Sequence, residues 1–74
     1  MDKKEYRGLK KKFMEVYQVH KKNDNLLDKL FPRFVGDFQG NMHLISWDSA
    51  YEYVKKDMPI ATVILWQMKR DGVI

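Results

Sequence analysis

The stretch that decides the fold is residues 57–74, DMPIATVILWQMKRDGVI. Pro59 suits the first turn of a helix, where its missing N–H leaves no hydrogen bond unmade, and we expect Asp57 to cap that helix. Gly72 is expected to end the helix, because glycine adopts the left-handed turn of a helix C-terminus without strain. The alternative is a buried β-strand over 60–68, which is rich in β-branched residues. The end signals and the length of the segment favour the helix.

A second helix is predicted at the start of the chain. Asp2 followed by Glu5 forms a capping-box pattern. The residues after it recur at spacings of three and four, which is typical of an amphipathic helix with one buried face. The members of this stripe are Tyr6, Leu9, Phe13, Val16, Tyr17 and His20. We expect His20 to be a packed, hydrogen-bonded histidine, and the helix to end near the Asn23-Asp24-Asn25 cluster.

The middle of the chain gives weaker signals. Leucines at 26, 27 and 30, together with Phe31, predict a short helix that Pro32 ends. The periodicity then fails over 33–47, which is either a loop or a small hairpin, with a short extended piece expected at 42–45. Ser46 is expected to cap a further helix, whose apolar positions recur at helical spacing. Those positions are Trp47, Ala50, Tyr51 and Val54.

Length and composition bound the fold class. The 74 residues form one domain, 1–74, and the absence of cysteine excludes disulfides, thiolate zinc sites and cysteine nucleophiles. We predict a mainly α fold, a small bundle of about four helices with one short β-strand or hairpin around residues 34–46. The first residues lack a secretory pattern, and the longest apolar run is far shorter than the roughly 20 residues that span a bilayer. A cytoplasmic protein without a membrane partner is expected.

Positive charge is concentrated at the N-terminus. Residues 1–22 hold eight Lys or Arg against three acidic residues, a net +5, whereas the other 52 residues carry a net −1. The basic side of the first helix consists of Lys3, Arg7, Lys10, Lys11, Lys21 and Lys22. Such a face neutralises phosphates of duplex DNA without sequence specificity. The alternative is a lysine-rich face that only contacts solvent.

The second half of the chain resembles a known DNA-binding family. Leu65 and Met68, then Gly72 and Ile74, have the spacing found where the recognition helix of winged-helix domains ends and the wing begins. Asp57 stands where those domains cap that helix. Residues 45–74 are therefore similar to the strand–helix–turn–helix part of winged-helix domains. The resemblance implies a three-helix core, and it implies that the last helix approaches DNA.

The last helix also carries the candidate binding residues. Thr62, Trp66, Lys69 and Arg70 share one of its sectors. Trp and Arg are enriched where proteins bind one another, so Trp66 is a candidate contact residue against DNA or protein. The alternative is that Trp66 packs against the N-terminal helix.

Nothing in the sequence indicates catalysis. The acidic residues are scattered at predicted helix starts and turns, and His43 has no second His or Cys at metal-ligand spacing. We expect no enzymatic activity, cofactor or metal.

Two hypotheses about function follow from these observations. In the first, the protein regulates or binds DNA through Thr62, Trp66, Lys69 and Arg70, with Lys3, Arg7, Lys10 and Lys11 on the backbone. In the second, it is a protein–protein interaction module, a homo-oligomer or a small inhibitor, that uses the apolar C-terminal helix.

Overall fold

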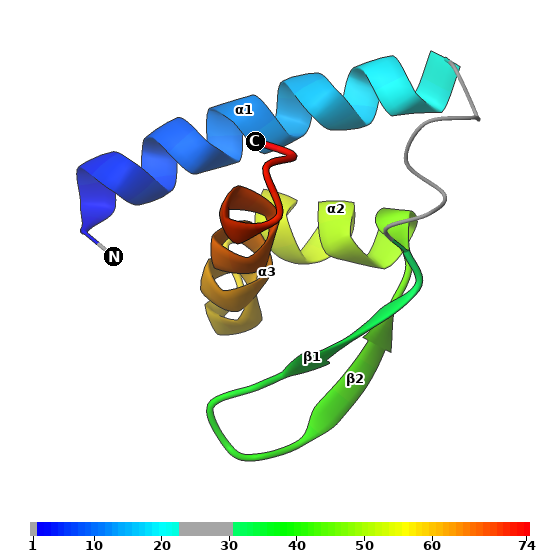
Figure 1. Ribbon diagram of the computed structural model, residues 1–74. Helices are drawn as coiled ribbons and strands as arrows, with labels where there is room; N and C mark the ends of the chain where they lie inside the picture. Colours follow the sequence, from blue (N-terminus) through cyan, green and yellow to red (C-terminus); the bar gives the residue numbers. More distant parts are fainter. Residues whose placement is uncertain (1, 23–30) are drawn as a thin grey trace.

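The computed structural model describes residues 2–22 and 31–74, with His20 and Lys22 described by their backbone alone. The chain forms α1 (Lys3–Lys22), β1 (Arg33–Gly36), β2 (Met42–Ile45), α2 (Trp47–Lys55) and α3 (Pro59–Arg70) (Figure 1). The mainly helical class with a small hairpin is confirmed. Three helices are present in the described residues, and four are not confirmed. The short helix expected at 26–31 falls almost entirely outside the described part of the chain.

The first helix begins as its sequence predicts. The backbone N–H of Glu5 donates to Asp2 Oδ1 at 2.7 Å, so Asp2 satisfies one of the free amides of the first turn. Along the predicted stripe, Leu9, Phe13 and Tyr17 are buried. The amphipathic pattern of α1 therefore corresponds to the face that packs on the core.

The segment 33–47, predicted to be either a loop or a small hairpin, contains a β-hairpin. The strands are antiparallel, with Phe34 opposite Leu44 and Val35 opposite His43. The turn begins at Asp37, whose carboxylate accepts the backbone N–H groups of Gln39 and Asn41 at 2.8 and 2.9 Å. A polar side chain that bonds its own turn in this way fixes the register of the two strands.

One prediction about the connection between α2 and α3 is wrong. Ser46 caps α2 as predicted, accepting the backbone N–H of Ser49 at 3.2 Å. Asp57 does not cap α3: the N-cap is Met58, and no side chain bonds the first turn. Instead Asp57 ends α2 in the left-handed region at φ 54°, and the N–H of Met58 donates to the carbonyl of Tyr53 at 3.0 Å. This hydrogen bond, from Met58 back to Tyr53, is the 6→1 bond of a Schellman motif. The left-handed residue of that motif, here Asp57, is more often a glycine.

The last segment is a helix, and the strand alternative is wrong. Pro59 lies in its first turn, and Gly72 ends it at φ 77°. The N–H of Val73 donates to the carbonyl of Met68 at 3.0 Å, which gives a second Schellman motif. Five of its twelve residues are buried: Ile60, Ala61, Ile64, Leu65 and Met68. The helix therefore forms the centre of the core.

The other elements pack around α3. Figure 1 shows α1 along one side of the molecule and the hairpin extending from the opposite side, with α2 and α3 between them. Phe13 of α1 lies against Trp47 of α2, with ring centroids 6.0 Å apart. The hairpin adds Val35 and Ile45 to the same cluster. The two ends of the molecule therefore present different elements to solvent.

Candidate functional site

The exposed edge of α3 is centred on Trp66. Its side chain is 53% exposed, so it does not pack beneath the N-terminal helix. The guanidinium carbon of Arg70 lies 5.2 Å from the centroid of the indole, within the range of a cation–π contact. The predicted pair of an exposed indole and a neighbouring cation is therefore present.

The two cations of this edge have acidic neighbours. Lys69 Nζ lies 2.7 Å from Glu5 Oε1, which joins the end of α3 to the start of α1. Arg70 Nε lies 3.3 Å from Asp71 Oδ1. Asp71 also accepts an ion pair from Arg33, whose Nη1 lies 2.7 Å away. The pKa of Asp71 is lowered, first by the hydrogen bond from Arg33. Much of the positive charge at this edge is thus locally compensated.

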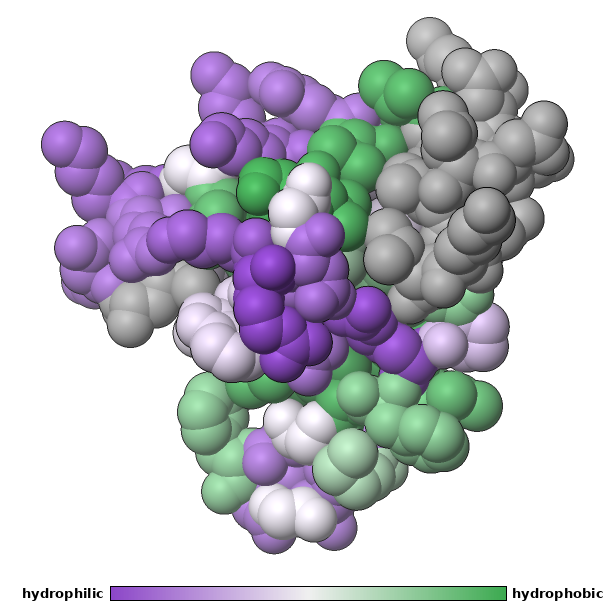
Figure 2. All heavy atoms as spheres, viewed as in Figure 1, coloured by the Kyte–Doolittle hydropathy of each residue, from purple (hydrophilic) through white to green (hydrophobic). Residues whose placement is uncertain are grey.

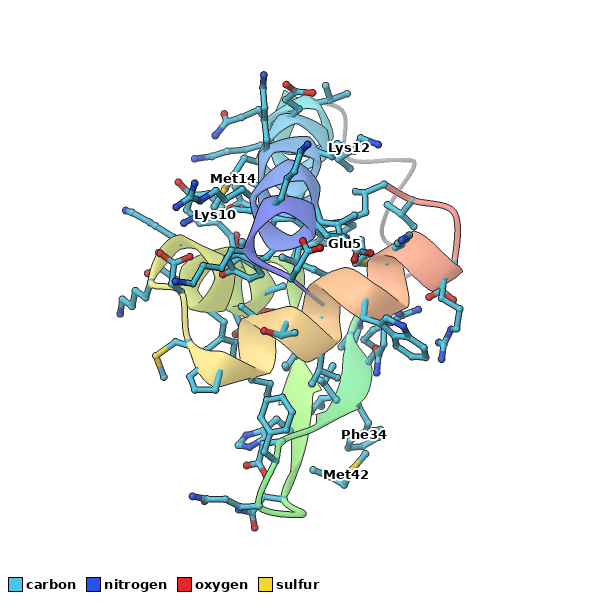
Figure 3. The ribbon with its side chains drawn as sticks, turned by 90° about the vertical axis from the view of Figure 1, so that its left-hand side faces the viewer. Glu5, Lys10, Lys12, Met14, Phe34 and Met42 are labelled. Atoms are coloured by element: carbon cyan, nitrogen blue, oxygen red, sulfur yellow. The ribbon has the colours of Figure 1, made fainter. Side chains whose placement is uncertain are left out.

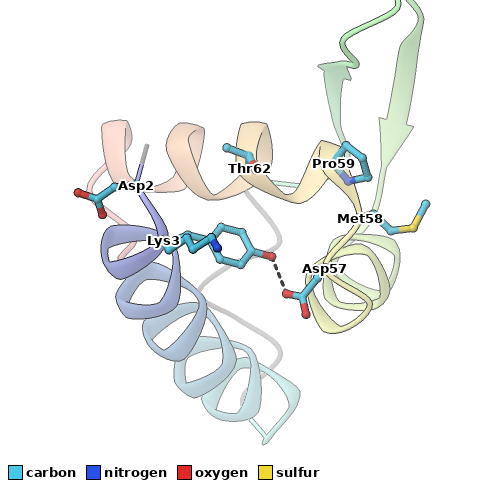
Figure 4. Close-up of a pocket in the computed structure, with 7 residues that line it drawn as sticks. Asp2, Lys3, Asp57, Met58, Pro59 and Thr62 are labelled. Atoms are coloured by element: carbon cyan, nitrogen blue, oxygen red, sulfur yellow. Dashed lines mark hydrogen bonds between the residues drawn. The ribbon is translucent and has the colours of Figure 1, made fainter.

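Thr62 lies one helical turn before Trp66 on α3. It lines a cavity of about 270 Å³ between the first turns of α1 and α3, together with Asp2, Lys3, Tyr6, Asp57, Met58 and Pro59 (Figure 4). Thr62 therefore borders this cavity, whereas Trp66 and Arg70 contact each other further along α3.

Asp57 joins α1 to the α2–α3 connection. Its Oδ1 accepts the hydroxyl of Tyr6 at 2.7 Å (Figure 4) and the ammonium of Lys10 at 2.8 Å. These two bonds, that from Lys10 first, lower the pKa of Asp57. Burial and the same carboxylate raise the pKa of Tyr6 to about 12. Lys10, predicted as a phosphate contact, is thus paired with an exposed carboxylate of the same chain.

The remaining basic face of α1 is open. Lys3, Arg7 and Lys11 are exposed, as are Lys4 and Lys12. Among the described residues, none of these five forms an ion pair. Figure 2 shows hydrophilic side chains gathered over the N-terminal half of α1. The described part of the chain therefore has a charged end formed by α1.

The outer face of the hairpin is the feature that the sequence reasoning missed. We use this name for the side of the β1–β2 sheet that carries Phe34, Met42 and Leu44, which are 65, 65 and 62% exposed. Figure 3 shows Phe34 and Met42 pointing to the same side of the hairpin. Residues 34 and 36 of β1 face residues 44 and 42 of β2, so the pleat places all three on one face. The signal was the pair of adjacent apolar residues in each strand, Phe34-Val35 and Leu44-Ile45, because neighbouring residues of a strand point to opposite faces.

The inner side of the hairpin tip borders a second cavity. Its volume is about 460 Å³, and its lining includes Phe38 and His43 of the hairpin and Tyr53 and Met58 of the helical connection. His43 Nε2 lies 2.8 Å from Asp37 Oδ2, so this imidazole is held by the turn carboxylate. That hydrogen bond, with the backbone N–H of Asn41, lowers the pKa of Asp37 to about 2. The carboxylate thus orients the histidine as well as the turn.

The described residues contain no group of three His, Cys, Asp or Glu side chains placed to hold a metal ion. Within the same ranges, none of the helices has the length and hydrophobicity to cross a bilayer. No protein-family model, curated protein or solved structure matches the chain. Any function must therefore be argued from these surfaces.

Proposed function

We propose that the chain is a non-catalytic protein-binding module that uses two exposed apolar features, Trp66 on α3 and the outer face of the hairpin. The observation that carries the proposal is the exposure of large apolar side chains beside a completely buried core. Phe13, Val35 and Leu65 are 0% exposed, so the fold buries large side chains well. Apolar side chains that stay clustered at the surface are typical of interaction sites.

The arrangement around Trp66 supports a protein partner at this edge. Arg70 lies against its indole, and Lys69 is paired with Glu5. Arg33 Nη1 is 3.4 Å from Gln67 Oε1, so the start of β1 lies beside this part of α3. Tryptophan and arginine carry a large share of binding energy at protein interfaces. A helix that reads DNA instead directs unpaired polar or cationic groups towards base edges.

DNA binding is the second candidate, and the basic face of α1 favours it. Lys3, Arg7 and Lys11 are exposed without an acidic partner in the described part of the chain. Cations arranged in this way bind phosphates with an affinity that falls steeply with salt. In this version α1 rather than α3 supplies most of the contact, because Lys69 is paired with Glu5.

Capture from source cells with matched variants tests the proposal. We expect wild-type protein to retain a protein partner after nuclease treatment, and Trp66→Ala to lose it. The control is Val19→Ala, since Val19 is 58% exposed on α1, outside the proposed surface. Val19→Ala removes an exposed side chain, so its free energy of unfolding should change by less than about 0.5 kcal/mol. Trp66→Ala also removes the half-buried indole and its contact with Arg70, so circular dichroism checks that this variant keeps its helices.

The same experiment separates the two candidates. Retention that nuclease abolishes, and that Lys4→Glu with Lys11→Glu abolishes at low salt, would establish the DNA version. Retention of the same partners by wild type and Trp66→Ala would contradict a role for the α3 edge. Duplicating the capture with Phe34→Ser tests the hairpin in the same way.

A further inference from the structure

We propose that the outer face of the hairpin binds a second copy of this chain, so that Phe34, Met42 and Leu44 of two copies pack together across a two-fold axis. This inference rests on the proposed protein-binding function and names the partner for one of its two surfaces. It is carried by the composition of the face, the open edge of the sheet and the distribution of charge.

The face itself is compact and uncharged. Phe34 lies directly opposite Leu44 in the register, and Met42 lies opposite Gly36. The sulfur of Met42 is 3.3 Å from the point that a Cβ on Gly36 would occupy, so the side chain of Met42 lies across this glycine. The three side chains therefore form one apolar surface, and a face of this kind is self-complementary under two-fold symmetry.

Both strands of the described sheet are also edge strands. In the described part of the chain, the β1–β2 pair is a two-stranded sheet, and β2 carries neither lysine nor proline. Natural edge strands are usually blunted by charge, proline or a covering element, because their unpaired amides and carbonyls recruit other strands. The short β2 has neither of the first two devices beside its exposed apolar face, so nothing charged within the strand opposes contact with another sheet of the same kind.

The distribution of charge favours a second copy. Two chains of net charge +4 repel each other, and the excess lies in residues 1–22. Residues 31–46 contain one Arg and one Asp and are neutral overall. Figure 1 shows the hairpin extending away from α1, in a molecule whose longest dimension is 34 Å. Contact through the hairpins directs both basic helices outward, and salt screens charges separated by more than about 8 Å.

The area of the outer face sets the expected affinity of the dimer. A stable dimer buries about 800 Å² on each partner, which is roughly 15% of the 5224 Å² surface of this chain. Three side chains supply only part of that area. We therefore expect a dimer that forms and dissociates with concentration, with a Kd on the order of 10–100 μM.

Light scattering and sedimentation of the purified chain test the inference directly. Between about 1 μM and about 1 mM, which brackets that Kd, the mass should rise from near 8.9 kDa towards twice that value. Leu44→Ser should keep the monomer mass throughout, and the control Val19→Ser should behave as wild type. A wild-type chain that remains monomeric at the highest concentration, or a Leu44→Ser chain that associates normally, would overturn the inference.

Cross-linking gives an independent measurement that does not depend on a polar substitution. The chain has no cysteine, so Leu44→Cys introduces a single thiol. Mild oxidation should join two copies through this position, and Val19→Cys should stay monomeric under the same conditions. Failure of the two proposals is distinguishable: a strictly monomeric chain that still loses a captured partner with Phe34→Ser retains the protein-binding function and excludes the second copy.

Discussion

The two faces of the β1–β2 hairpin carry similar side chains and have opposite surroundings. On the inner face, Val35 and Ile45 are 0 and 1% exposed. On the outer face, Phe34 and Leu44 are 65 and 62% exposed. Because successive residues of a strand point to opposite sides, Leu44 and Ile45 are chain neighbours in different environments. The comparison shows that hydrophobicity alone does not identify the core of this domain.

The difference separates two consequences of an apolar side chain. An inner residue stabilises the monomer, since its removal leaves a cavity beneath α3. An outer residue contributes little to the monomer, because its side chain stays in contact with water in the folded and unfolded states alike. In the proposed dimer, the outer residues instead stabilise the contact between two copies. Neighbouring substitutions on the two faces should therefore affect different measurements.

The largest predicted effect is on the inner face. Ile45→Ala removes a buried side chain, and the free energy of unfolding should fall by about 2–5 kcal/mol. Leu44→Ala should change it by less than about 0.5 kcal/mol at concentrations where the chain is monomeric. Urea unfolding followed by circular dichroism measures both. Equal losses for the two variants would show that the outer face is already covered within the monomer.

The second prediction concerns the turn that fixes which residues face inward. The pKa of Asp37 is held at about 2, against an ordinary value of 3.8, by its hydrogen bonds to His43 and to the turn amides. A lowered pKa means that this stabilisation is complete above pH 3.8 and is lost as the pH falls towards 2. Thermal midpoints should therefore decline over this range for the wild-type chain.

The variant Asp37→Asn isolates the part of this decline in thermal midpoint that is due to Asp37. Asp57 and Asp71 also have lowered pKa values, because of Lys10 and Arg33, so they contribute to the same decline. Asp37→Asn cannot ionise, and its midpoint should fall less between pH 4 and pH 2 than that of wild type. Identical slopes for the two proteins would contradict the role assigned to this carboxylate.

Local signals in the sequence predicted most of the helical structure. Asp2, Ser46, Pro59 and Gly72 each have the predicted role, because caps and turns depend on residues within one helical turn. Asp57 was assigned to the wrong helix. Three residues separate the end of α2 from the start of α3, so the same residue can serve either helix. The left-handed backbone of Asp57 belongs to the Schellman motif that ends α2, and only its bond to Lys10 depends on α1, which is distant in sequence.

The candidate site was predicted only in part. The sequence left two alternatives for Trp66, exposure to solvent or packing against the N-terminal helix. Helical periodicity shows which side of the helix a residue lies on, and it does not show whether another element covers that side. The outer face of the hairpin was not predicted, since RFVG and MHLI are only four residues long and lack the polar–apolar alternation that distinguishes a half-buried strand from a loop. Lys10 was assigned to a phosphate, and its pairing with Asp57 follows from tertiary structure.

The smallest predicted effect tests how loosely Met42 is held on the outer face. Gly36→Ala adds a methyl group that meets the sulfur of Met42 at 3.3 Å, a close contact. Met42 is 65% exposed and flexible, so it should move by a few tenths of an ångström without strain in the core. Alanine also restricts the unfolded chain, which offsets that contact, and the free energy of unfolding should change by less than about 0.5 kcal/mol.

Gly8→Ala is the control for this prediction, because Gly8 lies in α1 with nothing within 4 Å of an added Cβ. It should stabilise the chain by about 0.5–1 kcal/mol, the cost of glycine in a helix interior. A loss of more than about 1 kcal/mol for Gly36→Ala, with the expected gain for Gly8→Ala, would mean that Met42 is fixed in the monomer. The outer face would then behave as part of the core, and the contrast between the two faces would fail at this position. A small change in stability with a weaker dimer would instead assign Met42 to the surface between two copies.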